Sequence, residues 1–147
     1  MPQDTDADAM VDTLDLKGKV LYIEDNPINV ELIEAALERY PGITLLKATT
    51  GLEGIRLARS EKPDFVLLDM HLPDIGGLEV VRALNEEIAA GKLRITLLTG
   101  DSLSMDIVKA MSLGAYDYWL KPLRMEKLDA GLKRALSKGE RPGGADR

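Results

Sequence analysis

Apolar residues form five short, nearly continuous runs, separated by segments whose apolar residues recur at helical spacing. The alternation predicts an α/β fold in which a doubly wound, five-stranded parallel sheet carries helices on both faces. The run at residues 65–68 is apolar at every position, which is typical of a strand buried on both faces and therefore of the sheet centre. The predicted strands are Lys19–Ile23, Ile43–Ala48, Phe65–Leu68, Ile95–Leu98 and Tyr116–Leu120.

Capping residues and chain breakers set the expected helix ends. Asn26 is a good N-cap, Pro27 suits the first helical position, and Pro41-Gly42 ends this helix. Thr49 or Thr50 is expected to cap the second helix. The remaining helical segments are Leu78–Ile88, a segment from a cap at Ser102 or Ser104 to Gly114, and Met125–Leu136.

Length and charge narrow the class of protein. The 147 residues suit one domain, which we expect at residues 18–136 between polar, flexible tails at 1–17 and 137–147. The formal charge of −6 and the lack of a Lys/Arg cluster argue against a nucleic-acid partner. The sequence shows no signal peptide, no apolar run of membrane-spanning length and no cysteine, so we expect a cytoplasmic protein without membrane contact.

Polar residues with distinct chemistry follow the predicted strands. Glu24 and Asp25 follow the first, Asp69 the third, Thr99 the fourth and Lys121 the fifth. Because ligands of open parallel sheets bind outside the carboxyl ends of the strands, these side chains should converge. Three carboxylates, a hydroxyl and an ammonium suit a hard cation and a phosphoryl group. We expect Mg²⁺, with Mn²⁺ as an alternative, bound directly by Asp25 and Asp69 and through water by Glu24.

Around these residues the sequence resembles the response-regulator receiver domain, the CheY-like family. The resemblance spans Gly18 to Leu136 and implies a flavodoxin-like (βα)5 fold with strand order 2-1-3-4-5. The sequence departs from the family at Glu24, where aspartate is frequent, and at Gly76, where a polar residue is frequent. The matching segments are LYIEDNPIN at 21–29, FVLLDMHLPDIGGLEV at 65–80, ITLLTGD at 95–101 and GAYDYWLKPL at 114–123.

The resemblance implies a role for each polar residue at the strand ends. Asp69 corresponds to the phosphoacceptor. Glu24 and Asp25 correspond to the acidic pair that binds Mg²⁺. Lys121 corresponds to the lysine that stabilises charge on Asp69 or on the phosphoryl group. The backbone carbonyl of His71 would complete the metal site, whereas its side chain is expected to be exposed.

Two further residues correspond to the family's switch. Thr99 is the expected switch hydroxyl, which donates to a phosphoryl oxygen, and Tyr118 is the expected switch aromatic residue. Phosphorylation should draw Thr99 toward the new oxygens and let Tyr118 turn inward. The surface that changes would combine the fourth helix, which ends at Gly114, with the strand Tyr116–Leu120 and the helix Met125–Leu136. A downstream protein partner is expected there, with the chain a monomer or weak dimer.

The predicted function is that of a two-component signalling receiver rather than an enzyme. Its phosphoryl donor would be the phosphohistidine of a histidine kinase or of a histidine phosphotransfer protein. Because few residues follow Leu136, we expect no effector domain, and output by protein contact or by onward transfer in a phosphorelay. The EDNPxN segment is similar to receivers attached to hybrid kinases, so both a stand-alone and an excised receiver fit.

Two alternatives remain open from the residues alone. A Mg²⁺-dependent phosphatase of the haloacid-dehalogenase type uses the same Asp, Thr and Lys set. That family has a second acid two residues after its nucleophile, where this chain has His71. The other alternative is a degenerate receiver that acts as a constitutive binding module, which the complete set of polar residues argues against.

Overall fold

The computed structural model describes residues 15–100 and 104–137. Most of both predicted tails, and the candidate cap Ser102, lie outside the described residues. Within them, five parallel strands form one sheet in the order β2-β1-β3-β4-β5, which confirms the predicted fold class and topology. The strands are β1 (Gly18–Ile23), β2 (Ile43–Ala48), β3 (Phe65–Asp69), β4 (Ile95–Thr99) and β5 (Asp117–Leu120).

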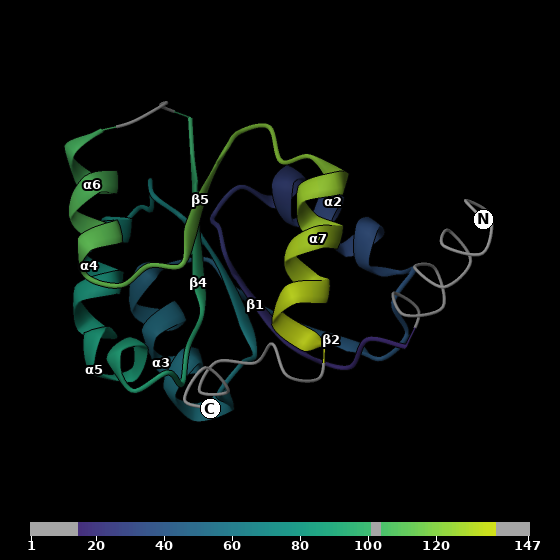
Figure 1. Cartoon of the computed structure of the whole chain (residues 1–147). Helices are drawn as coiled ribbons and strands as arrows, with labels where there is room; N and C mark the ends of the chain where they lie inside the picture. The colour runs from purple at the N-terminus through teal and green to yellow at the C-terminus, as the bar shows by residue number, and fades with distance from the viewer. Residues whose placement is uncertain (1–14, 101–103, 138–147) are drawn as a thin grey trace.

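Helices cover both faces of the sheet (Figure 1). Helices α3 to α6 lie on one face, and α2 and α7 lie on the other. None of the helices in the described ranges is long and apolar enough to cross a membrane. The helices are α2 (Pro27–Leu37), α3 (Gly51–Glu61), α4 (Gly77–Ala83), α5 (Asn85–Ala89), α6 (Met105–Ser112) and α7 (Met125–Leu136).

Local capping chemistry accounts for several of these helix starts. The side chain of Asn26 accepts a hydrogen bond from the Ile28 amide at the start of α2. Thr50 and Ser104 cap α3 and α6 in the same way. The sequence had left open whether Thr49 or Thr50 caps α3, and the structure assigns this role to Thr50.

One predicted helix is divided, and one predicted strand is shorter. The single helix expected over Leu78–Ile88 is wrong: α4 and α5 are separated at Leu84, whose ψ of 14° departs from α-helical geometry while its side chain is buried. At this break the side chain of Asn85 donates to the Leu113 carbonyl oxygen at 3.0 Å, so a contact with the end of α6, 28 residues away, accompanies the division of the helix. Strand β5 begins at Asp117 rather than Tyr116, a difference within the usual spread of strand ends.

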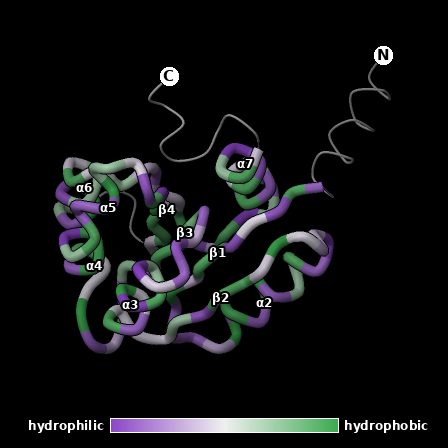
Figure 2. Tube along the Cα trace, turned by 90° about the horizontal axis from the view of Figure 1, so that it is seen from below, coloured by the Kyte–Doolittle hydropathy of each residue, from purple (hydrophilic) through white to green (hydrophobic). Residues whose placement is uncertain are grey.

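The core lies on both sides of the three inner strands. Because side chains alternate along a strand, Leu21 and Leu68 pack toward the α3–α6 layer, whereas Tyr22 and Leu67 pack toward α2 and α7. The hydrophobic colour in Figure 2 accordingly follows the central strands. Leu16, which the sequence placed in the N-terminal tail, is also buried in the second of these layers.

Candidate functional site

The carboxyl ends of the strands gather the acidic residues into one cluster. Glu24 and Asp25 follow β1 and Asp69 ends β3, the neighbouring strand. One carboxylate oxygen from each of the three lies within 4.8 Å of the others. Sequence reasoning had placed all three at this edge, and the structure brings them together there.

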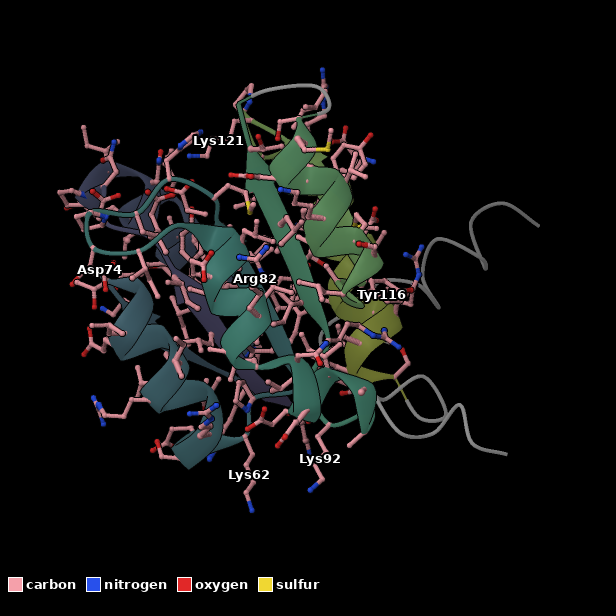
Figure 3. The ribbon with its side chains drawn as sticks, turned by 90° about the vertical axis from the view of Figure 1, so that its left-hand side faces the viewer. Lys62, Asp74, Arg82, Lys92, Tyr116 and Lys121 are labelled. Atoms are coloured by element: carbon pink, nitrogen blue, oxygen red, sulfur yellow. The ribbon has the colours of Figure 1, made fainter. Side chains whose placement is uncertain are left out.

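Lys121 supplies the positive charge of the cluster. Its Nζ lies 3.0 Å from Asp69 Oδ1 and 3.9 Å from Glu24 Oε1. In Figure 3 Lys121 lies toward the end of the molecule opposite to Lys62 and Lys92. One ammonium faces three carboxylates, so the site carries an excess of negative charge that a divalent cation would neutralise.

Burial increases the energetic cost of this excess negative charge. Glu24 and Asp69 are 1% and 2% exposed, whereas Asp25 is exposed to solvent. Burial, followed by the neighbouring Asp69 carboxylate, raises the pKa of Glu24, and the Asn26 amide and Lys121 offset this only in part. Clustered oxygen ligands with too little positive charge fit a hard cation such as Mg²⁺.

The raised pKa of Glu24 predicts how stability depends on pH without metal. The pKa of Glu24 is higher in the folded than in the unfolded protein, so the folded protein binds more protons between these two pKa values. The free energy of unfolding should therefore fall as pH rises through this range. We expect Glu24→Gln to be more stable relative to wild type at pH 8 than at pH 5. Urea unfolding in EDTA at both pH values measures this difference, and an equal difference at the two values would contradict the assignment.

The loop after Asp69 is tied down at both its base and its tip. At the base, the His71 amide donates to Asp69 Oδ1 at 3.2 Å, and the Gly77 amide donates to the Met70 carbonyl oxygen at 3.1 Å. His71 is exposed, as predicted, and its amide is the part that contacts Asp69. Both bonds hold the peptide between Met70 and His71, the neighbour of the peptide that would offer the His71 carbonyl to a metal.

Asp74 fixes the tip of this loop and was missed by sequence reasoning. Its carboxylate accepts the Gly51 and Leu52 amides at 2.8 and 2.9 Å, at the start of α3. The Thr50 side chain accepts the Glu53 amide, and the carboxylate of Asp74 caps the two amides before it. The hydrogen bond from the Leu52 amide is the foremost cause of the lowered pKa of Asp74. A partner 23 positions away in the sequence leaves no local pattern that would reveal it.

The two predicted switch residues lie on adjacent strands. Thr99 ends β4 and is buried, and its carbonyl oxygen accepts the Lys121 amide at 2.8 Å. Tyr118 of β5 is half-buried and packs against the core layer on the α3–α6 side. Thr99 and His71 also line a hollow of about 410 Å³ next to the start of α6. Asp101, two residues after Thr99 in the sequence, lies outside the described residues.

Comparison with known proteins decides the family. The model of the response regulator receiver domain matches residues 20–133. The chain belongs to this family. Receiver domains of two-component systems are regulatory phosphoacceptors that histidine kinases phosphorylate, and they bind Mg²⁺ in an acidic pocket. The haloacid-dehalogenase alternative finds no support in these comparisons.

Individual relatives agree with the family. The chain is 36% identical over 122 residues to the transcriptional regulatory protein AfsQ1 of Streptomyces coelicolor, with 83% of this chain and 52% of AfsQ1 covered. It is 34% identical to protein PilH of Pseudomonas aeruginosa, with 76% of this chain and 91% of PilH covered. This receiver chain therefore spans about half the length of AfsQ1 but most of PilH.

A solved structure bears on the acidic cluster. The receiver domain of the sensor histidine kinase PA1611 from Pseudomonas aeruginosa PAO1 superposes with a TM-score of 0.72 at 28% identity. The match covers 83% of this chain and 99% of that domain. That structure contains a magnesium ion coordinated in its active-site cleft.

Proposed function

We propose that this receiver accepts a phosphoryl group on Asp69 from the phosphohistidine of a histidine kinase or histidine phosphotransfer protein. One observation carries the proposal: Asp69 lies buried between an acidic pair and the Lys121 ammonium, 3.0 Å away. Mg²⁺ would be bound by Asp25, Asp69 and the His71 carbonyl, with Glu24 acting through water. Mn²⁺ prefers the same oxygen ligands and could replace it.

The transfer makes one bond and breaks another. An Asp69 carboxylate oxygen attacks phosphorus, the P–O bond forms, and the P–N bond to imidazole breaks as the ring nitrogen takes up a proton. When bound, the divalent cation supplies positive charge that offsets repulsion between the carboxylate and the phosphoryl oxygens. Lys121 and the His71 amide hold Asp69 in a fixed orientation throughout.

The signal would leave through the switch residues. Phosphorylation adds about −1.5 to −2 of charge, which favours movement of the Thr99 hydroxyl toward the new oxygens. Tyr118 would then turn inward beside α6 and reshape the face formed by α6, β5 and α7. This face already exposes the apolar residues Met105, Tyr116 and Leu120, which suits a downstream protein or weak self-association. Onward transfer of the phosphoryl group in a relay is the other output.

The donor needs a surface from which its imidazole can reach Asp69. An apolar groove of about 540 Å³ between α2 and α7 opens beside Lys121 and is lined by Leu32, Ile33, Leu123 and Met125 among others. Leu32 is 64% exposed at its rim. We infer that the phosphohistidine protein rests on this groove while its imidazole faces the site.

Substitution at the groove rim should separate protein donors from small ones. We expect Leu32→Gln to slow phosphotransfer from a phosphorylated histidine protein about tenfold, because the apolar contact is lost. Labelling by acetyl phosphate, which needs no docking, should not change. Leu52→Gln is the matched control, since Leu52 is 62% exposed but lies on α3. Equal losses with both donors would exclude a docking role for Leu32.

Treatment with acetyl phosphate and Mg²⁺ tests the proposed function as a whole. A persistent mass gain of one phosphoryl group, absent in EDTA, is the expected result. Continuous hydrolysis of a phosphomonoester such as p-nitrophenyl phosphate would instead mark an enzyme. Absence of both reactions would mark a binding module, and either of these outcomes overturns the proposal.

A further inference from the structure

Tyr22 places a buried hydroxyl beside the acidic cluster. Tyr22 and Glu24 are two residues apart along extended chain, so their side chains point to the same side of the sheet. The Tyr22 hydroxyl donates to Glu24 Oε1 at 3.1 Å, and the tyrosine is only 3% exposed. Its ring packs in the core layer shared with α2 and α7, so neighbouring side chains fix where the hydroxyl lies.

The carboxylate of Glu24 has few other hydrogen-bond donors among the described residues. Its Oε2 accepts the Asn26 amide at 3.2 Å. The other oxygen, Oε1, lies 3.9 Å from Lys121 Nζ, which is beyond hydrogen-bond distance. Among the described residues, the hydrogen bond to Oε1 comes from the Tyr22 hydroxyl. A glutamate also has one more rotatable bond than an aspartate, and two separate donors are needed to hold both carboxylate oxygens in place.

We propose that Tyr22 is a positioning residue for the metal site: its hydroxyl holds the Glu24 carboxylate toward Asp25 and Asp69 and thereby sets the affinity for Mg²⁺. The inference rests on the proposed function, because it assumes that this acidic cluster binds the cation. Tyr22 touches neither the cation nor the phosphoryl group and acts only through Glu24. Partners of this kind orient metal-binding side chains and commonly change metal affinity by about 10- to 100-fold.

Two Tyr→Phe variants test this role in the full chain. Tyr22→Phe keeps the packed ring and removes the hydroxyl, and we expect Mg²⁺ affinity measured by isothermal titration calorimetry to fall about tenfold. Tyr40→Phe is the matched control. Tyr40 is equally buried in the same core layer, and its hydroxyl donates to Asp129, far along the chain from the acidic residues. Its removal should cost stability but leave Mg²⁺ affinity unchanged.

A second background shows whether the effect passes through Glu24. In Glu24→Asp the shorter side chain withdraws from the tyrosine, so adding Tyr22→Phe should cause no further loss of Mg²⁺ affinity. The same loss in both backgrounds, or wild-type affinity in Tyr22→Phe, would overturn the positioning role. Failure of the wild-type protein itself to bind Mg²⁺ would instead overturn the proposed function, so the two failures can be told apart.

Discussion

Asp69→Asn should yield no acyl phosphate. The amide keeps the shape of the side chain but is not a nucleophile, whereas Lys121 and the His71 amide can still bond its carbonyl oxygen. The fold should be retained, because the substitution removes one of three crowded carboxylates. The intact mass after treatment with acetyl phosphate and Mg²⁺ should stay at the unmodified value, a loss of more than about 100-fold in labelling.

Asp74→Asn is the control for this experiment. It neutralises a carboxylate in the same loop that is exposed and bonded to the start of α3 rather than to the acidic cluster. It should still be labelled. Undiminished labelling of Asp69→Asn would place the acceptor on another residue.

Thr99→Ala should accept the phosphoryl group on Asp69 but fail to transmit the conformational change to α6 and β5. The nucleophile and the three carboxylates remain, so labelling on Asp69 should continue. A phosphoryl group can shift a conformational equilibrium only through contacts that differ between the two states, and the Thr99 hydroxyl is the proposed contact. Losing it should remove about 1–3 kcal/mol of coupling, seen as smaller phosphorylation-dependent NMR shifts across α6 and β5.

Thr96→Ala provides the comparison on the same strand. Thr96 is also buried in β4, but within the described ranges its hydroxyl has no hydrogen-bond partner. Its removal should leave the phosphorylation-dependent shifts intact. If Thr99→Ala shows the full wild-type shift pattern when phosphorylated, the route from Thr99 to Tyr118 is wrong.

The strands were predictable because a strand that is buried on both faces has a continuous run of apolar residues. A central parallel strand faces helices on both sides, so β3 has no polar position until Asp69, and that polar ending also marks the site. The carboxyl ends of parallel strands share one edge, so Glu24, Asp25 and Lys121 could be placed near Asp69 without coordinates. Sheet order was implied by the family resemblance rather than by the hydrophobic pattern.

Contacts between distant segments were not predictable in the same way. The break at Leu84 accompanies a bond from Asn85 to the carbonyl of Leu113, 28 residues away. The anchoring of Asp74 on α3 is of the same kind. Tyr22 had a local signal, since it lies two residues before Glu24 on one strand, but a tyrosine in an apolar run is ordinarily a packing residue. Only the geometry shows that its hydroxyl meets a buried carboxylate.

Chemical mapping of the modified residue tests the central claim most directly. Borohydride reduces an aspartyl phosphate to homoserine, so phosphorylated wild-type protein can be reduced, digested and sequenced by mass spectrometry. Phosphorylation on Asp69 predicts homoserine at position 69, present only when acetyl phosphate and Mg²⁺ were both supplied. Homoserine at another aspartate, or a phosphoryl group that survives on a different type of side chain, would contradict the account.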